Sequence, residues 1–273
     1  MKIEEKFRKL EDRNEGAYMP HIYYGDPTEE FSQKEVKILA ENGADFLEFG
    51  IPFSDPTADG PVFQDACERA LNNGITPEKC IRGIEKLREE GLEIPIIVTT
   101  YYNIPYKFGI ESFLNKLNET GAQGLIVPNL PIEEANELLK ASKKADIDII
   151  FQVTPNTSEE RLKKIVKASS GFLYVVNFEG VTGVRNAIAN STKELISTIK
   201  KHTNTPLMAG FGVSKPSHAK SLVSAGADGA ITGSALGEIY GENLEAPEKT
   251  LSKIGDFAKK IKNGCNEGYE NRT

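Results

Sequence analysis

The chain has 273 residues, 39% of them hydrophobic and 27% charged, so it can bury a core and does not have a disordered composition. Its net charge of -7 argues against nucleic-acid binding, because phosphate contacts need a basic surface. It has no apolar run near the roughly 20 residues that span a bilayer, and its charged N-terminus does not resemble a signal peptide.

The three cysteines, Cys67, Cys80 and Cys265, are far apart in the sequence. They form no C-x-x-C motif and pair with no histidine in a zinc-binding spacing, so we predict reduced thiols and no metal site. Together with the absence of targeting and membrane signals, this predicts a cytoplasmic protein that binds neither nucleic acid nor membrane.

The elements in chain order begin with a short amphipathic helix, with Ile3, Phe7 and Leu10 on one side. Eight apolar, β-rich runs follow, each leading into a segment of helical periodicity. These runs are HIYY (21–24), FLEFG (46–50), IPIIVTTY (94–101), GLIVP (124–128), DIIFQVT (148–154), FLYVVNF (172–178), PLMAGFG (206–212) and GAITGS (229–234). The clearest helical segments are residues 132–145 and 158–170.

Strands that alternate with helices predict parallel βαβ units, and near-continuous apolar strands predict burial on both faces. Eight such units in about 250 residues match a closed (β/α)8 barrel, the TIM barrel of the α/β class. We therefore predict a single barrel domain over residues 1–261, with an extra N-terminal helix and a short extra helix near strand eight. The polar residues 262–273 are predicted to be a frayed tail.

An internal repeat supports this organisation. ENGADFLEFG, ETGAQGLIVP and SAGADGAITG each end a helix with Gly-Ala and then enter a strand. Gly43, Gly121 and Gly226 are predicted to take the left-handed conformation that commonly ends helices.

In such a barrel the active site lies in the loops at the C-terminal ends of the strands. The second of these loops lies within the stretch LEFGIPFSDPTADGP, residues 47–61, after the end of the strand. Its Glu48 is predicted either to point outward into a salt bridge or to point inward as a general acid/base whose pKa is raised by burial. Asp59 lies in the loop, where an Asx turn is the alternative to a catalytic role.

The last loops of the barrel predict a phosphate site. Gly233 and Ser234 fall where a short helix begins after strand eight, and free N–H groups at a helix N-terminus bind anions. Gly212 lies in the preceding loop, and its lack of a side chain allows the backbone of that loop to approach the phosphate site closely. Paired carboxylates alone also fit glycoside hydrolysis, but that chemistry does not explain the phosphate loops. His21 is assigned either to the pocket or to the core.

Residues 47–71, LEFGIPFSDPTADGPVFQDACERAL, resemble the signature of the tryptophan synthase α subunit family. The resemblance covers nearly the whole chain. Its other segments are YYGDP (23–27), TYYNIPYKFGIESF (100–113), VTGVR (181–185), AGFGVSKP (209–216) and ADGAITGSAL (227–236).

The resemblance implies a lyase that cleaves indole-3-glycerol phosphate to indole and glyceraldehyde 3-phosphate without a metal or an organic cofactor. It implies that Glu48 is the acid/base and that Asp59 stabilises positive charge on the indole ring. The other implied substrate-binding residues are Tyr174, Tyr101, Thr182 and Phe211, and the implied phosphate-binding residues are Gly183, Gly212, Gly233 and Ser234.

The same resemblance implies a partner, a pyridoxal-phosphate β subunit that receives the indole within an α2β2 heterotetramer. Three departures from the family pattern bear on this. Asn129 stands where an aspartate is usual, Asn177 and Phe178 replace a Ser-Arg pair, and His21 replaces an apolar residue. The changes at Asn129 and at Asn177 and Phe178 leave open a stand-alone lyase that releases free indole. A non-catalytic activating partner is a further alternative, against which the intact Glu48 and Asp59 argue. Another phosphate-binding barrel, such as an epimerase, would need metal ligands that the sequence lacks.

Overall fold

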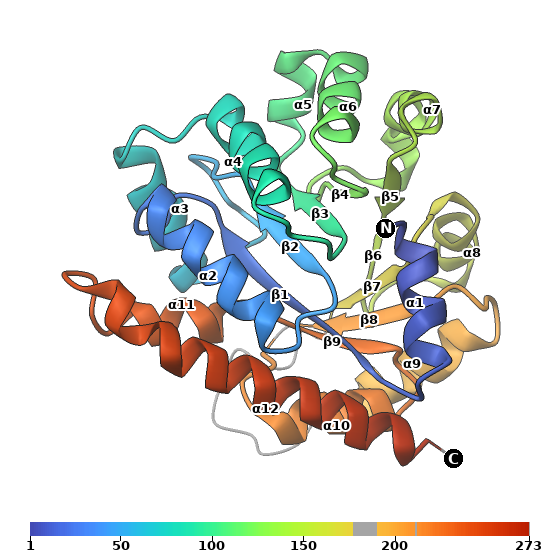
Figure 1. Cartoon of the computed structure of the whole chain (residues 1–273). Coiled ribbons are helices and arrows are strands. Elements are labelled where there is room, and N and C mark those ends of the chain that lie inside the picture. The colour runs from blue at the N-terminus through green and yellow to red at the C-terminus, as the bar shows by residue number, and fades with distance from the viewer. Residues whose placement is uncertain (177–189, 211, 273) are drawn as a thin grey trace.

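The strands form a ring inside a layer of helices (Figure 1). The computed structural model describes residues 1–176, 190–210 and 212–272. Within them, all strand pairs are parallel, in the order β5-β4-β3-β2-β1-β9-β8-β7-β6. The strands are β1 Ala17–Tyr23, β2 Leu47–Gly50, β3 Ile96–Thr99, β4 Gly124–Ile126, β5 Asp148–Ile150, β6 Gln152–Val153, β7 Leu173–Val176, β8 Leu207–Gly210 and β9 Gly229–Thr232. This is the predicted TIM barrel.

The barrel is closed by the chain itself between its two end strands. The run 148–154, predicted as one strand, forms β5 and β6 with only Phe151 between them. The carbonyl oxygen of Phe151 accepts a hydrogen bond from the Tyr174 N–H at 3.1 Å, so the ring of strands continues past the interruption. The ninth strand is therefore a division of the fifth predicted strand, and the eight-fold arrangement stands.

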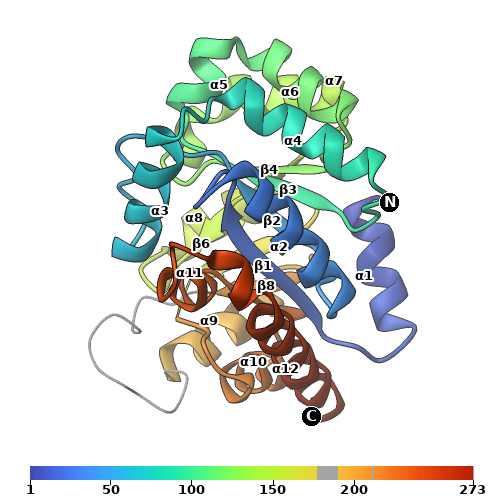
Figure 2. The ribbon, with the colours of Figure 1, turned by 60° about the vertical axis from the view of Figure 1, so that its left-hand side comes forward.

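The helices cover the outside of the ring (Figure 2). They are α1 Ile3–Glu11, α2 Glu29–Glu41, α3 Pro61–Asn72, α4 Pro77–Glu89, α5 Asn103–Phe108, α6 Ile110–Glu119, η1 Ile132–Glu134, α7 Asn136–Ala145, α8 Glu159–Ala168, α9 Asn190–Lys200, α10 Pro216–Ser224, α11 Ser234–Gly241, η3 Pro247–Thr250 and α12 Leu251–Glu270. The predicted left-handed glycines are confirmed, with φ of 103° at Gly43, 84° at Gly121 and 107° at Gly226. None of the helices in these ranges is both long and apolar enough to cross a membrane.

Two apolar layers hold the barrel together. The interior layer comes from alternate residues of the strands and is joined by the apolar side of α1, as predicted from Ile3, Phe7 and Leu10. Phe7 lies 4.7 Å from Phe46, centroid to centroid, so α1 packs against barrel-interior side chains. The larger layer lies between the outward faces of the strands and the surrounding helices. Burial on both faces explains why the strands are apolar throughout.

The prediction of a frayed tail from residue 262 was wrong, because α12 continues to Glu270. Gly264 and Gly268 let this helix lie directly on α10, since a Cβ at Gly264 would clash with the Pro216 backbone and one at Gly268 with the Lys220 backbone. Lys262 is buried and forms an ion pair with Asp45 at 2.8 Å. Although this segment is polar in composition, it has a buried face made of Gly264, Gly268, Cys265 and the paired Lys262.

Asp45, at the N-terminal side of β2, is the centre of this buried network. Its carboxylate accepts the Tyr18 N–H at 3.0 Å and pairs with Lys6 at 2.9 Å as well as with Lys262. Asp45→Ala removes the acceptor of the Tyr18 N–H and the ion-pair partner of Lys6, and it leaves Lys262 with Glu15 and the Gly16 carbonyl alone. We therefore expect a loss of about 1–3 kcal/mol in the free energy of unfolding. Urea denaturation measures it.

The matched control is the exposed pair between Lys2 and Asp146, whose side chains are 73% and 69% accessible. Asp146→Asn keeps a residue that tolerates the left-handed backbone there and should change the free energy of unfolding by about 1 kcal/mol or less. Equal effects of the two substitutions would contradict a structural role for the Asp45 network.

Candidate active site

Glu48 points into the barrel, which decides between the two predicted orientations. It follows the interior residue Phe46 by two positions on β2, and alternate residues of a strand share a face. Its side chain is buried, with a residue exposure of 2%, and Oε1 accepts a hydrogen bond from Thr99 Oγ1 at 2.6 Å. Among the described strands, Glu48 is the one fully buried carboxylate, whereas Asp148 on β5 is partly exposed.

Burial raises the pKa of Glu48 to about 8, although the Thr99 hydrogen bond acts in the opposite direction and the charge of Asp59 adds to the increase. The carboxyl group is therefore largely protonated at neutral pH. Its second oxygen, Oε2, has no hydrogen-bond partner among the residues that the structure describes. A protonated carboxyl with an unoccupied oxygen in an apolar wall can donate a proton to a bound molecule.

Asp59 lies in the loop between β2 and α3, held by two tyrosines. Its Oδ2 accepts hydrogen bonds from Tyr23 OH at 2.8 Å and Tyr101 OH at 2.6 Å. Tyr101 OH also accepts the Ala58 N–H at 2.9 Å, so the tyrosine orders the loop backbone beside the acid. Burial raises the pKa of Asp59, and the two phenol hydrogen bonds oppose that increase. The Asx-turn alternative does not explain these long-range partners.

Tyr174, on β7, faces the two acids from across the barrel. It is 8% exposed, and burial followed by the nearby charges of Glu48 and Asp59 raises its pKa well above the usual value, so it is a neutral phenol. A Cβ at Gly210 would lie 3.0 Å from its hydroxyl, which explains the glycine at that position of β8. The predicted residues Glu48, Asp59, Tyr101 and Tyr174 thus belong to one end of the barrel.

The predicted phosphate positions lie at the ends of the last strands. Ser234 is the exposed first residue of α11, and Gly233 precedes it directly after β9. A Cβ at Gly233 would come within 2.8 Å of the Phe63 ring, so only glycine fits there. Gly212 is exposed and has φ of 73°. Thr182, Gly183 and Phe211 lie outside the described residues.

Two functional neighbours were missing from the sequence prediction, Thr99 and Tyr23. Both share the interior face with predicted residues: Thr99 follows the interior residue Ile97 by two positions, and Tyr23 follows His21. Counting by two along each predicted strand toward its C-terminal end was the signal that could have found them. Neither residue type by itself marks a site.

The sequence comparison decides the family. Residues 7–266 match the sequence model described as "Tryptophan synthase alpha chain". The chain belongs to the tryptophan synthase alpha chain family. The resemblance predicted from residues 47–71 is thereby confirmed.

The relatives of the chain match it along nearly their whole length. It is 46% identical over 245 residues to the tryptophan synthase alpha chain of Methanocaldococcus jannaschii, covering 90% of this chain and 86% of that protein. A tryptophan synthase alpha chain structure from Legionella pneumophila superposes with a TM-score of 0.88 at 31% identity, covering 96% of both chains. A tryptophan synthase structure from M. tuberculosis in an aminoacrylate-bound form gives a TM-score of 0.85 at 29% identity, covering 96% of this chain and 98% of that one.

In this member of the family, Asp26 braces both halves of the site. The buried carboxylate receives two hydrogen bonds from Arg69 on α3, at 2.7 and 2.9 Å, and one from Tyr240 OH on α11, at 2.5 Å. Because α3 follows the Asp59 loop and α11 begins at Ser234, one carboxylate ties the acid end to the predicted phosphate end.

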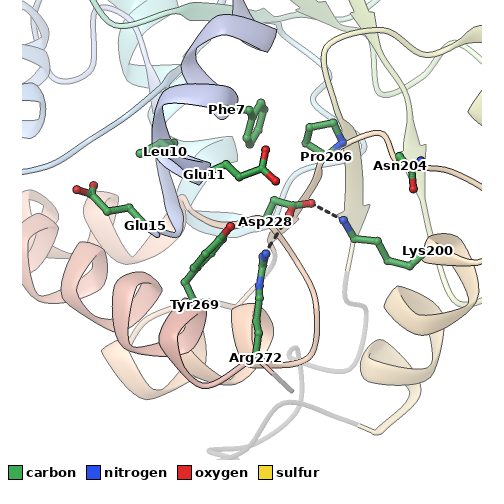
Figure 3. Close-up of a pocket in the computed structure, with 10 residues that line it drawn as sticks. All are labelled: Phe7, Leu10, Glu11, Glu15, Lys200, Asn204, Pro206, Asp228, Tyr269 and Arg272. Atoms are coloured by element: carbon green, nitrogen blue, oxygen red, sulfur yellow. Dashed lines mark hydrogen bonds and ion pairs between the residues drawn. The ribbon is translucent and has the colours of Figure 1, made fainter. Parts of the chain in front are cut away.

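A separate cavity of about 320 Å³ lies at the opposite end of this alpha-chain barrel, beside the N-terminal ends of β8 and β9 (Figure 3). Its central residue Asp228 pairs with Lys200 at 2.7 Å and with Arg272 at 3.2 Å. Arg272 also lies over the Tyr269 ring. Lys200 and Arg272 share Asp228, and Glu11 and Glu15 also line the cavity, so its lining has no excess of positive charge to bind an anion. The acids of the other end therefore remain the candidate site.

Proposed function

We propose that the chain is the α subunit of a tryptophan synthase and cleaves indole-3-glycerol phosphate to indole and glyceraldehyde 3-phosphate. The observation that carries this proposal is the pair of unlike acids. Glu48 is an interior carboxyl with a pKa of about 8 and a free oxygen, and Asp59 is a loop carboxyl held by two phenols. A retro-aldol cleavage of this substrate needs one proton donor and one fixed negative charge.

The proposed reaction uses Glu48 twice. Its carboxyl group first gives a proton to C3 of the indole, which places positive charge on the ring system. Asp59 accepts a hydrogen bond from the ring N–H and stabilises that charge. The carbon–carbon bond then breaks as the adjacent hydroxyl loses its proton, leaving an aldehyde and neutral indole. The hydroxyl proton returns to Glu48, so the acid is restored at the end of the cycle.

The rest of the substrate is assigned to the remaining predicted residues. Tyr101 and Tyr174 are proposed to line the indole pocket, and the first turn of α11 at Ser234 to bind the phosphate through its N–H groups. Gly212 and Gly233 are proposed to leave room for the phosphate oxygens. Thr182, Gly183 and Phe211 keep their predicted roles in substrate and phosphate binding as proposals.

The proposed partner is a β subunit with pyridoxal phosphate, arranged with this chain as α2β2. Support comes from the solved M. tuberculosis proteins, which are structures of tryptophan synthase with 95–97% coverage of this chain. The chain itself is proposed to need no cofactor, since both proposed catalytic groups are its own carboxyls. Asn129 is exposed and its Oδ1 accepts the Tyr102 N–H at 2.8 Å, so an amide replaces a charge near the proposed partner surface. The cytoplasm remains the predicted compartment, consistent with three free, buried cysteines.

The test is indole release from indole-3-glycerol phosphate by the purified chain, alone and with a β subunit. We expect slow release by the chain alone and a marked increase with the partner, if the partner favours closure of the loops over the substrate. Fast release that a β subunit does not change would indicate a stand-alone lyase. Activation of the β subunit without any indole release would indicate a non-catalytic partner, and both results would contradict the proposal.

A further inference from the structure

His21 occupies the position between the two ends of the proposed site. It lies on β1, the strand between β2 with Glu48 and β9, which leads into Gly233. It is paired in register with Glu48, and its Nδ1 lies 3.5 Å from Glu48 Oε1. On its other side, the His21 Cβ lies 3.8 Å from the position of a Cβ at Gly233.

The side chain belongs to the interior layer. His21 follows the interior residues Ala17 and Met19 at intervals of two along β1. It is 7% exposed, and its ring lies 4.5 Å from Phe63 and 5.1 Å from Tyr23, centroid to centroid. The two assignments left open by the sequence, pocket and core, are thus both partly right: the ring is packed like a core residue and faces the acid of the site.

One nitrogen of this ring is unpaired within the described part of the chain. His21 Nε2 is buried and forms no hydrogen bond with any described residue. A buried polar atom left unpaired costs about 1–3 kcal/mol, and such atoms are commonly explained by a functional role. Burial also lowers the pKa of His21 to about 3, so the imidazole is neutral and carries one N–H and one acceptor nitrogen.

The substrate must pass this residue. A molecule with its indole C3 at Glu48 and its phosphate at Ser234 runs its glycerol chain from β2 to β9, across β1. The interior residue of β1 in this layer is His21. Resting on the function proposed above, we propose that His21 is a second catalytic residue that carries the proton of the glycerol hydroxyl to Glu48.

The transfer balances with the two oxygens of Glu48 in separate roles. Oε2, which has no partner, gives its proton to C3 and leaves a carboxylate. As the carbon–carbon bond breaks, the hydroxyl proton moves to His21 Nε2 while the Nδ1 proton moves to Glu48 Oε1. Both transfers occur together, so no buried imidazolium forms. The imidazole then carries its proton on Nε2 and the carboxyl group carries its proton on Oε1. Water that enters after product release takes the Nε2 proton and gives a proton to Oε2 while Oε1 returns its proton to Nδ1, which restores the starting state.

The test compares His21→Leu and His21→Gln with the wild-type chain in complex with a β subunit. Because Glu48 can take the hydroxyl proton directly when no imidazole intervenes, we expect kcat to fall by about tenfold, less than for loss of the acid, with KM changed less than threefold. Gln fills a similar volume but cannot pass a proton from one atom to another. If the Leu variant fails to fold, the Gln variant alone tests whether His21 carries the proton.

The decisive readout is a proton inventory, the rate of a single turnover in mixtures of light and heavy water. Two protons in flight give a curved plot for the wild type, and one proton gives a straight plot for both His21 variants. Groups facing the ring that also exchange protons are Glu48 and Tyr23, with Asp59 beyond the Tyr23 hydroxyl. All of these groups are retained in the variants.

The matched control is His202→Gln, a histidine outside the site that pairs with Glu159 at 3.9 Å, and it should leave rate and plot unchanged. A straight plot for the wild type, or a kcat within twofold of wild type in both His21 variants, would overturn the relay and leave the proposed function intact. Absence of indole release by the wild-type complex would overturn the proposed function itself.

Discussion

Replacing Glu48 with glutamine is expected to lower indole release by about 100-fold or more, since a positioned general acid/base typically contributes 100- to 10,000-fold. Glutamine fits the same space and can still accept the Thr99 hydrogen bond, but it has no proton to give to C3. The measurement is kcat at saturating indole-3-glycerol phosphate, with the wild-type chain assayed in parallel. A variant that retains more than a tenth of the wild-type rate would show that another group supplies the proton.

The same substitution should make the fold less sensitive to pH. The Glu48 pKa is about 8 in the folded chain and near the ordinary 4.5 when unfolded. Between these values the unfolded chain has lost the proton that the folded chain keeps, so the free energy of unfolding falls as pH rises. Glu48→Gln removes this contribution, and the variant should gain stability relative to wild type from pH 5 to pH 8.

Denaturant titrations at several pH values measure this difference. Glu35 is also buried with its pKa raised well above the usual value, but it is present in both proteins and cancels in the comparison. We expect the Glu48→Gln variant to lose activity and to be more stable than the wild type at high pH, because the buried acid that the reaction needs lowers the stability of the fold. Parallel stability curves for the two proteins would mean that Glu48 titrates normally in the folded state.

The fold could be predicted from the sequence because its signals are local. Apolar runs alternate with helical segments, and left-handed glycines end three helices, so the barrel and the N-terminal helix followed directly. The C-terminal helix did not, because its burial depends on close contact between Gly264 or Gly268 and the α10 backbone. Glycine lowers helix propensity, so the sequence predicts a frayed tail, and only the contact with α10 makes a helix favourable here.

The site was predicted to a similar extent and for a similar reason. Glu48 and Asp59 stand in a long motif, so a resemblance could place them. The partners that set their protonation, Thr99 and Tyr23, come from other strands, and their contacts depend on barrel register. The same holds for His21, whose two possible roles could be weighed only with its distances to Glu48 and Gly233 in hand.

Replacing Asp59 with asparagine is expected to lower kcat by about 100-fold while KM changes only a few-fold, as is typical of removing one electrostatic group that acts in the transition state. The amide oxygen can still accept the hydrogen bonds of Tyr23 and Tyr101, so the loop keeps its position. What is lost is the negative charge that we propose lies opposite the indole N–H. That charge matters after C3 is protonated and little before, which is why the effect falls on kcat.

The substitution Tyr101→Phe tests the position of Asp59 separately from its charge. It removes one hydrogen bond to Asp59 and the acceptor of the Ala58 N–H, but it leaves the carboxylate in place. Losing the Ala58 contact loosens the loop, so KM should rise, and kcat should fall far less than in Asp59→Asn. If Asp59→Asn instead raised KM and left kcat unchanged, Asp59 would bind the ground state and transition state equally, and stabilisation of the protonated ring would have to come from elsewhere in the site.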